Sequence, residues 1–184
     1  YAGDAITTGD ANVAVGMHAL GATTTGDFNT AVGRGAVAAN TTASNNTGLG
    51  YSALSTNTTG TANVAVGRSA LEASTTASNN TGLGYGALAA NTTGSDNAAV
   101  GKQAMPVNTT GESNTAVGST ALTVNTTGSF NTVMGRSALG LNTTGNHNVA
   151  IGRNALAANI TSSNNVAVGQ SSLTACLGAY NTGI

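Results

Sequence analysis

Aliphatic and small residues return along this chain at a fixed interval of 17 residues. From Asn12 onward, each unit reads Asn, Thr or Val, a small residue, an aliphatic residue and Gly, followed by two variable residues and then Ala-Leu. Numbering the unit 1 to 17 puts Asn at position 1 in ten successive copies: Asn12, Asn29, Asn46, Asn63, Asn80, Asn97, Asn114, Asn131, Asn148 and Asn165. A glycine stands at position 5 of every copy. Such a short internal period is typical of a solenoid, in which each repeat stacks on the next.

The unit favours strands over helices. Units built from helix pairs need about 33 residues or more, whereas this unit has 17 and carries Gly at position 5 and Thr at positions 13 and 14. Gly and Thr are poor helix formers, and β-branched residues between Gly-bearing turns are typical of short strands. We therefore predict an all-β fold, a parallel β-solenoid (β-roll) of about ten coils, with two short strands in each coil.

The apolar positions suggest which side chains face the interior. Position 4 is aliphatic in every copy and position 9 is Leu, Val or Met, so both are predicted to point inward. Position 3 is Ala or Gly except at Val133, and would then face outward. Either a neighbouring chain packed along the outside, or a thin solenoid whose other wall lies close, would explain these small residues. Position 8 is Ala except at Ser172, which indicates close packing.

Polar residues also recur in columns. A Thr-Thr pair fills positions 13 and 14 in eight copies, and adjacent strand residues face opposite ways, so one Thr should point out and the other in. Stacked Thr and stacked Asn are expected to hydrogen-bond to their own kind in coils about 4.8 Å apart, which gives ten coils a length of about 48 Å. The Asn ladder would be formed at position 12 by Asn40, Asn57, Asn91, Asn108, Asn125, Asn142 and Asn159.

The whole chain, residues 1–184, is expected to be one repeat array: a partial coil at 1–11, full coils at 12–180 and the start of a further coil at 181–184. The last start arrives one residue early, and no other copy gains or loses a residue. Because the first residue is Tyr1 rather than Met, we expect a segment of a longer fibre. An array without inserted loops favours a shaft whose role is length and stiffness.

Charge and chemistry exclude several classes of function. Only 6% of residues are charged and the net charge is −1, so no attraction to nucleic acid or to an anionic membrane is predicted. No apolar run is long enough to cross a membrane. His18 and His147 occupy different positions of distant copies and form no metal pair. The acidic residues look scattered, and no nucleophile–base–acid set is present. We therefore predict no catalysis, no cofactor and no metal.

All five basic residues fall at position 6, which two tyrosines share. Stacking should set this column in one line, where Arg beside Tyr allows cation–π contact. Two interpretations are open: a stripe that binds acidic or sugar ligands, or simply the solvated position with room for long side chains. The candidate stripe is Arg34, Tyr51, Arg68, Tyr85, Lys102, Arg136 and Arg153.

The sequence resembles known fibre repeats. The segment from Asn63 to Ala70, Asn-Val-Ala-Val-Gly-Arg-Ser-Ala, resembles the head repeat of YadA-like trimeric autotransporter adhesins. The full unit, as in Asn80 to Asp96, is similar to repeats of phage tail-fibre-type and bacterial surface proteins. The resemblance implies a left-handed parallel β-roll, three chains side by side and a role in attachment. The YadA-type repeat is shorter, so its strand and turn lengths do not transfer.

These observations favour a structural or adhesive fibre segment, outside the cell on a virion or a bacterial surface. Its expected partners are further copies of the chain, as a trimer, and a host-surface glycan or receptor that the position 6 stripe would bind. The alternative is an ice-binding solenoid that uses an outward Thr ladder. Adjacent Thr residues, such as Thr92 and Thr93, face opposite ways and so offer only one Thr per face.

Overall fold

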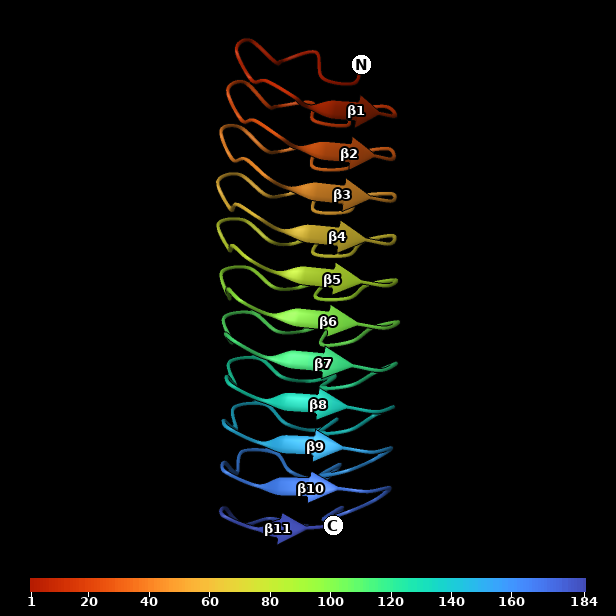
Figure 1. The fold of residues 1–184 in the computed structure, drawn as a ribbon, viewed down its shortest axis with the longest axis vertical. Coiled ribbons are helices and arrows are strands. Elements are labelled where there is room, and N and C mark those ends of the chain that lie inside the picture. The colour runs from red at the N-terminus through yellow and green to blue at the C-terminus, as the bar shows by residue number, and fades with distance from the viewer.

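The computed structural model describes all residues 1–184 as one straight stack of coils (Figure 1). Eleven short strands run in the same direction on one side of the stack and form a single parallel sheet in sequence order. They are β1 (Val13–Val15), β2 (Thr30–Val32), β3 (Thr47–Leu49), β4 (Val64–Val66), β5 (Thr81–Leu83), β6 (Ala98–Val100), β7 (Thr115–Val117), β8 (Thr132–Met134), β9 (Val149–Ile151), β10 (Val166–Val168) and β11 (Thr182–Gly183). The chain has no helix that could span a membrane.

The strand register follows the sequence period. In the first ladder Val13 pairs with Thr30, and in the next Thr30 pairs with Thr47, so equivalent positions lie in adjacent layers. The shortened last copy keeps this alignment, because Val166 pairs with Thr182, one residue earlier than the period would give. The predicted parallel β-solenoid with one coil per unit is confirmed.

Each coil contains one strand rather than the two that were predicted. The strand covers positions 2 to 4, and turns occupy most of the rest of the coil. Residues at positions 7 and 9 have left-handed backbone angles, for example Ser69 with φ of 56° and Leu71 with φ of 51°. Extended backbone needs a strongly negative φ, so the chain turns twice here and folds back beneath its own strand.

In each strand the side chain at position 3 points into the interior, and the side chain at position 4 does not. Ala65 and Ala99 at position 3 are fully buried, whereas Val32 at position 4 is 38% exposed. The predicted directions of positions 3 and 4 are therefore wrong, while positions 8 and 9 do point inward. In the core, the small position 3 residues of the sheet face the position 8 and position 9 residues of the turns. The buried turn residues are Ala19, Leu20, Ala36, Val37, Ala53, Leu54, Ala70, Leu71, Ala87, Leu88, Ala104, Met105, Ala121, Leu122, Ala138, Leu139, Ala155 and Leu156.

The closeness of the opposite wall explains why position 3 is small. A Cβ atom added to Gly48 would lie 2.6 Å from Cγ2 of Val37, a position 9 side chain. At Gly82 it would lie 3.4 Å from Cγ of Leu71. The thin-solenoid explanation is thus correct. The crowding at position 3 comes from within the chain and gives no support to a neighbouring chain.

Two buried Asn ladders flank this apolar column. The predicted ladder at position 12 is present, as where Asn108 Nδ2 donates to Asn91 Oδ1 at 2.8 Å. The second ladder, at position 1, was not predicted. Asn80 Oδ1 accepts the backbone N–H of Asn97 at 3.0 Å, and Asn80 Nδ2 donates to the carbonyl of Gly94 at 3.0 Å. Each position 1 Asn therefore ties a strand to its own turn and to the next coil.

The ladder at position 12 is interrupted at Ser74, which is too short to continue it. The Ser74 hydroxyl and Oδ1 of Asn57 are both buried without a hydrogen-bond partner. We expect Ser74→Asn to raise the free energy of unfolding by about 1–2 kcal/mol, because it restores a donor to Asn57 and an acceptor to Asn91. Urea unfolding would measure the change. Ser74→Ala is the control and should be close to neutral; equal stability of the two variants would contradict the role given to the ladder.

The two residues of the Thr pair differ in exposure, as expected, but their hydrogen bonds differ from the prediction. Position 13 is half-buried, and its hydroxyl donates to a backbone carbonyl of the next coil, as from Thr92 Oγ1 to Thr109 O at 3.0 Å. It does not bond to the next Thr side chain. Position 14 is exposed, and the hydroxyl of Thr93, for example, makes no hydrogen bond within the chain.

Candidate functional site: the outer sheet face and its two edges

The side chains at positions 2 and 4 of the strands form what we call the outer face. Because these positions alternate with the buried position 3, they point away from the core along the whole sheet. Position 2 is Thr, Val or Ala and position 4 is aliphatic, so the face carries no charge. Its position 4 members are half-buried or exposed: Val15, Val32, Leu49, Val66, Leu83, Val100, Val117, Met134, Ile151 and Val168. The result is an unbroken apolar row on the surface of the stack.

Position 6 follows each strand, at the edge marked by the arrowheads in Figure 1, and its basic residues define the basic edge. Arg34 lies 5.8 Å from the ring centre of Tyr51, and Arg68 lies 5.7 Å from that ring and 5.9 Å from the ring of Tyr85. The structure therefore brings four members of the predicted stripe into cation–π contact. The other members, Lys102, Arg136 and Arg153, are exposed and make no such contact.

None of the basic side chains pairs with an acid within the chain. The one ion pair joins the Tyr1 amino group to Asp4 at 3.4 Å and involves no basic side chain. The basic edge therefore presents charges that remain available to a partner.

Positions 16 and 17 precede each strand and form the opposite edge, which we call the acidic edge. It holds Asp10, Asp27 and Glu112 at position 16 and Asp96 at position 17. The acids look scattered along the linear sequence, yet four of the six share this edge in the stack. They are spread along the stack, and no group of acidic, His or Cys residues could hold a metal ion.

Aromatic residues also occupy the acidic edge. Phe28 and Phe130 at position 17 are 62% and 53% exposed. Phe130 stacks on His147 of the next coil, with ring centres 5.0 Å apart and planes 3° apart. The outer face is thus bordered by cations and Tyr on one side and by carboxylates and Phe on the other.

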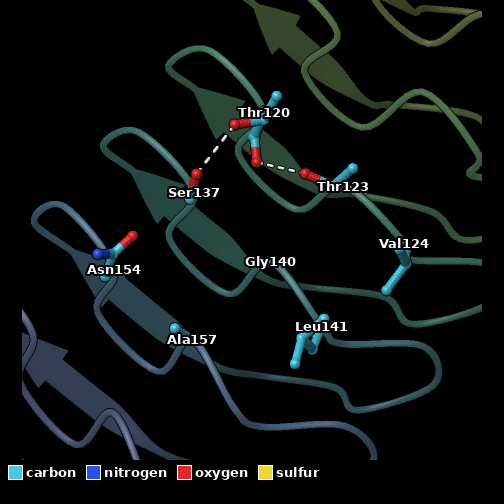
Figure 2. A pocket seen from close by; sticks show the side chains of 8 residues that line it. All are labelled: Thr120, Thr123, Val124, Ser137, Gly140, Leu141, Asn154 and Ala157. Carbon is cyan, nitrogen blue, oxygen red and sulfur yellow. Dashed lines mark hydrogen bonds between the residues drawn. The ribbon is translucent and has the colours of Figure 1, made fainter.

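A shallow hollow lies elsewhere on the surface, among the turns that follow β7, β8 and β9 (Figure 2). It has a volume of about 370 Å³ and arises where Gly140 and Ala157 leave space beside larger neighbours. The Thr120 and Ser137 hydroxyls are joined at 3.0 Å on one rim. Its lining consists of Thr120, Thr123, Val124, Ser137, Gly140, Leu141, Asn154 and Ala157. None of these side chains titrates near neutral pH, so the hollow offers no acid–base chemistry.

Comparison with known proteins gives no match to a family model, to a curated protein or to a solved structure.

Proposed function

We propose that this chain is a segment of a structural or adhesive fibre, without catalysis, that associates with further copies of itself through the outer face. The observation that carries the proposal is the uncharged aliphatic row at position 4, which continues without a break from β1 to β10. Exposed apolar surfaces of this continuity are typical of interaction sites. Without a covering partner, the row would leave a long apolar stripe in water.

The regular spacing of the row favours a second copy as the partner. Each coil presents one aliphatic side chain at position 4, and neighbouring coils lie about 4.8 Å apart. A partner keeps contact with every coil only if its own surface repeats at the same spacing. Another copy of this chain has the same spacing because it has the same repeat, whereas a globular partner does not.

The rest of the proposal draws on the resemblance and on the regularity of the array. Similarity to trimeric adhesin and tail-fibre repeats favours three chains around one axis, placed outside the cell on a virion or a bacterial surface. Ten full coils without an inserted loop fit a shaft that provides length and stiffness. A host glycan or receptor would be held by the members of the position 6 stripe that stay exposed in the assembly.

We expect charge on the outer face to abolish this association. The native chain should sediment at about three times 17.7 kDa, and Val100→Asp with Val117→Asp should return it to a monomer, because burying carboxylates in an apolar contact is costly. Thr93→Asp with Thr110→Asp is the matched control at exposed positions off the face and should leave the mass unchanged. Circular dichroism checks that both variants keep the fold. A native chain that stays monomeric at all concentrations would contradict the proposal.

Ice binding is the second candidate, and the exposed threonines of position 14 favour it. Nine of them stand in line: Thr25, Thr42, Thr59, Thr76, Thr93, Thr110, Thr127, Thr144 and Thr161. The hydroxyls at position 13 are engaged with backbone carbonyls, so only position 14 would be free to meet ice. Thermal hysteresis that disappears on Thr93→Tyr, Thr110→Tyr and Thr127→Tyr would favour this candidate over the fibre.

A further inference from the structure

We infer that copies of this chain associate in parallel around an axis along the stack, with the basic edge of one chain against the acidic edge of the next. This inference rests on the proposed association through the outer face and adds its orientation and its contacts. It concerns an interface between copies of this chain.

The separation of charge on either side of the outer face is the first argument. All five basic residues follow a strand, at position 6, and four of the six acids precede one, at positions 16 and 17. Since a strand residue advances about 3.3 Å, a three-residue strand keeps the edges about 10 Å apart. The face between them is neutral. Each chain therefore has one positive border and one negative border, both next to the surface that is proposed to be covered.

The symmetry of the assembly determines which edges of neighbouring chains meet, and so the charge separation favours one relative orientation of the chains. Rotation about an axis parallel to the stack brings the arrowhead edge of one copy to the strand-start edge of its neighbour, so that bases face acids. Rotation about an axis perpendicular to the stack turns the neighbour upside down and places bases against bases. Opposed like charges disfavour a contact, whereas complementary borders specify partner and register. The charge pattern therefore favours parallel chains.

Closure of the ring determines which residues of neighbouring chains lie at the same height along the axis. A closed cyclic assembly has no shift along its axis, so the two ends of the same strand meet across each contact. Asp27 and Arg34 flank β2, and Asp96 and Lys102 flank β6. These residues would pair between neighbouring chains in an unshifted ring.

An aromatic contact extends the seam beyond the ion pairs. Phe130 precedes β8 and Arg136 follows it, so the guanidinium of one chain would lie near the exposed Phe ring of the next. Cation–π contact is favourable for this pair. Arg68 and Arg153 flank strands whose opposite edge is uncharged, and Arg68 already stacks on Tyr51 and Tyr85.

Reversing the charge of one edge at a time tests the seam. Arg34→Glu with Lys102→Glu places acid against acid across the contacts beside β2 and β6, and Asp27→Lys with Asp96→Lys places base against base at the same two contacts. We expect each pair of substitutions to weaken association about tenfold or more, and the chain carrying all four to recover most of the loss. Sedimentation equilibrium at low and high salt measures the association. High salt should reduce the difference in association between the native and the substituted chains, because it screens exposed charges.

Cross-linking tests the orientation independently of the charges. With Cys176→Ser as background, Val32→Cys in β2 should cross-link to itself through a short bis-maleimide if the chains are parallel. In antiparallel chains it would instead cross-link to Val168→Cys in β10, at the other end of the stack. Cross-linking of that second kind, or association unaffected by edge reversal, would overturn the inference while leaving the proposed association intact. A native chain that never associates would overturn both.

Discussion

Gly84→Ala is expected to lower the free energy of unfolding by about 3 kcal/mol or more. Gly84 stands at position 5, directly after β5, with φ of 132°, a backbone angle that residues with a Cβ atom rarely adopt. An added Cβ would also lie 2.6 Å from the carbonyl oxygen of Gly101 in the next coil. Strained backbone costs about 1–3 kcal/mol, and the clash adds to it because the obstacle is backbone that cannot rotate away. Urea unfolding followed by circular dichroism would measure the loss.

Gly86→Ser is the matched control, two residues further along the same turn. Gly86 has φ of 63°, but an added Cβ would meet only Cγ of Gln103, at 3.7 Å. Serine already occupies the same position in other copies, as Ser52 and Ser69 with φ of 53° and 56°. The control should change stability by less than about 1 kcal/mol. Equal losses for the two variants would show that close approach between coils is not what requires glycine at position 5.

The period of the sequence predicted the stacking because it fixes which residues share a layer. Asn63 and Asn80 are 17 residues apart, and Asn80 donates its backbone N–H to the Asn63 side chain in the solenoid. The cation–π column was predicted for the same reason, since Arg68 and Tyr85 share position 6. Any property that depends only on adjacency between copies could be deduced in this way.

The direction of the strand side chains could not be deduced from hydrophobicity. A strand alternates with a period of two, so an error of one residue exchanges its two faces. Val66 is more apolar than Ala65, yet Ala65 is buried and Val66 points outward. In this thin coil, Leu71 on the turn fills the interior and leaves room only for a small residue opposite. The most apolar strand position therefore marks the outer face, and the small residues of position 3 reflect the opposite wall of the coil rather than a neighbouring chain.

The turns were missed because their backbone angles contradict ordinary preferences. Leucine rarely takes a positive φ, yet Leu88 and Leu122 have φ of 52°. These angles persist because the buried side chain fixes them within the coil. The only local signal was glycine at position 7 in two copies, Gly35 and Gly86. The acidic edge, by contrast, was visible once acids were sorted by position in the repeat.

Asn97→Ala is expected to cost about 3 kcal/mol of unfolding free energy. Asn97 Oδ1 is the acceptor for the backbone N–H of Asn114 at 3.0 Å, within a fully buried ladder. Alanine would leave that N–H without a partner, at about 1–3 kcal/mol, and would leave a cavity. The bond from Asn97 Nδ2 to Gly111 O is lost as well, although that carbonyl keeps the donor of Asn108 at 2.9 Å. The midpoint of urea unfolding would measure the effect.

Asn79→Ala is the same chemical change on an exposed side chain. Asn79 stands at position 17, where Ala62 already shows that alanine is accepted at φ of 57°. Its side chain donates only to the exposed carboxylate of Asp96, at 3.1 Å, a contact that contributes little in water. We expect a loss below about 1 kcal/mol. If Asn97→Ala cost no more than this control, the buried Asn ladder would contribute no more than an exposed contact, and the backbone hydrogen bonds between coils and the apolar column would have to hold the stack together.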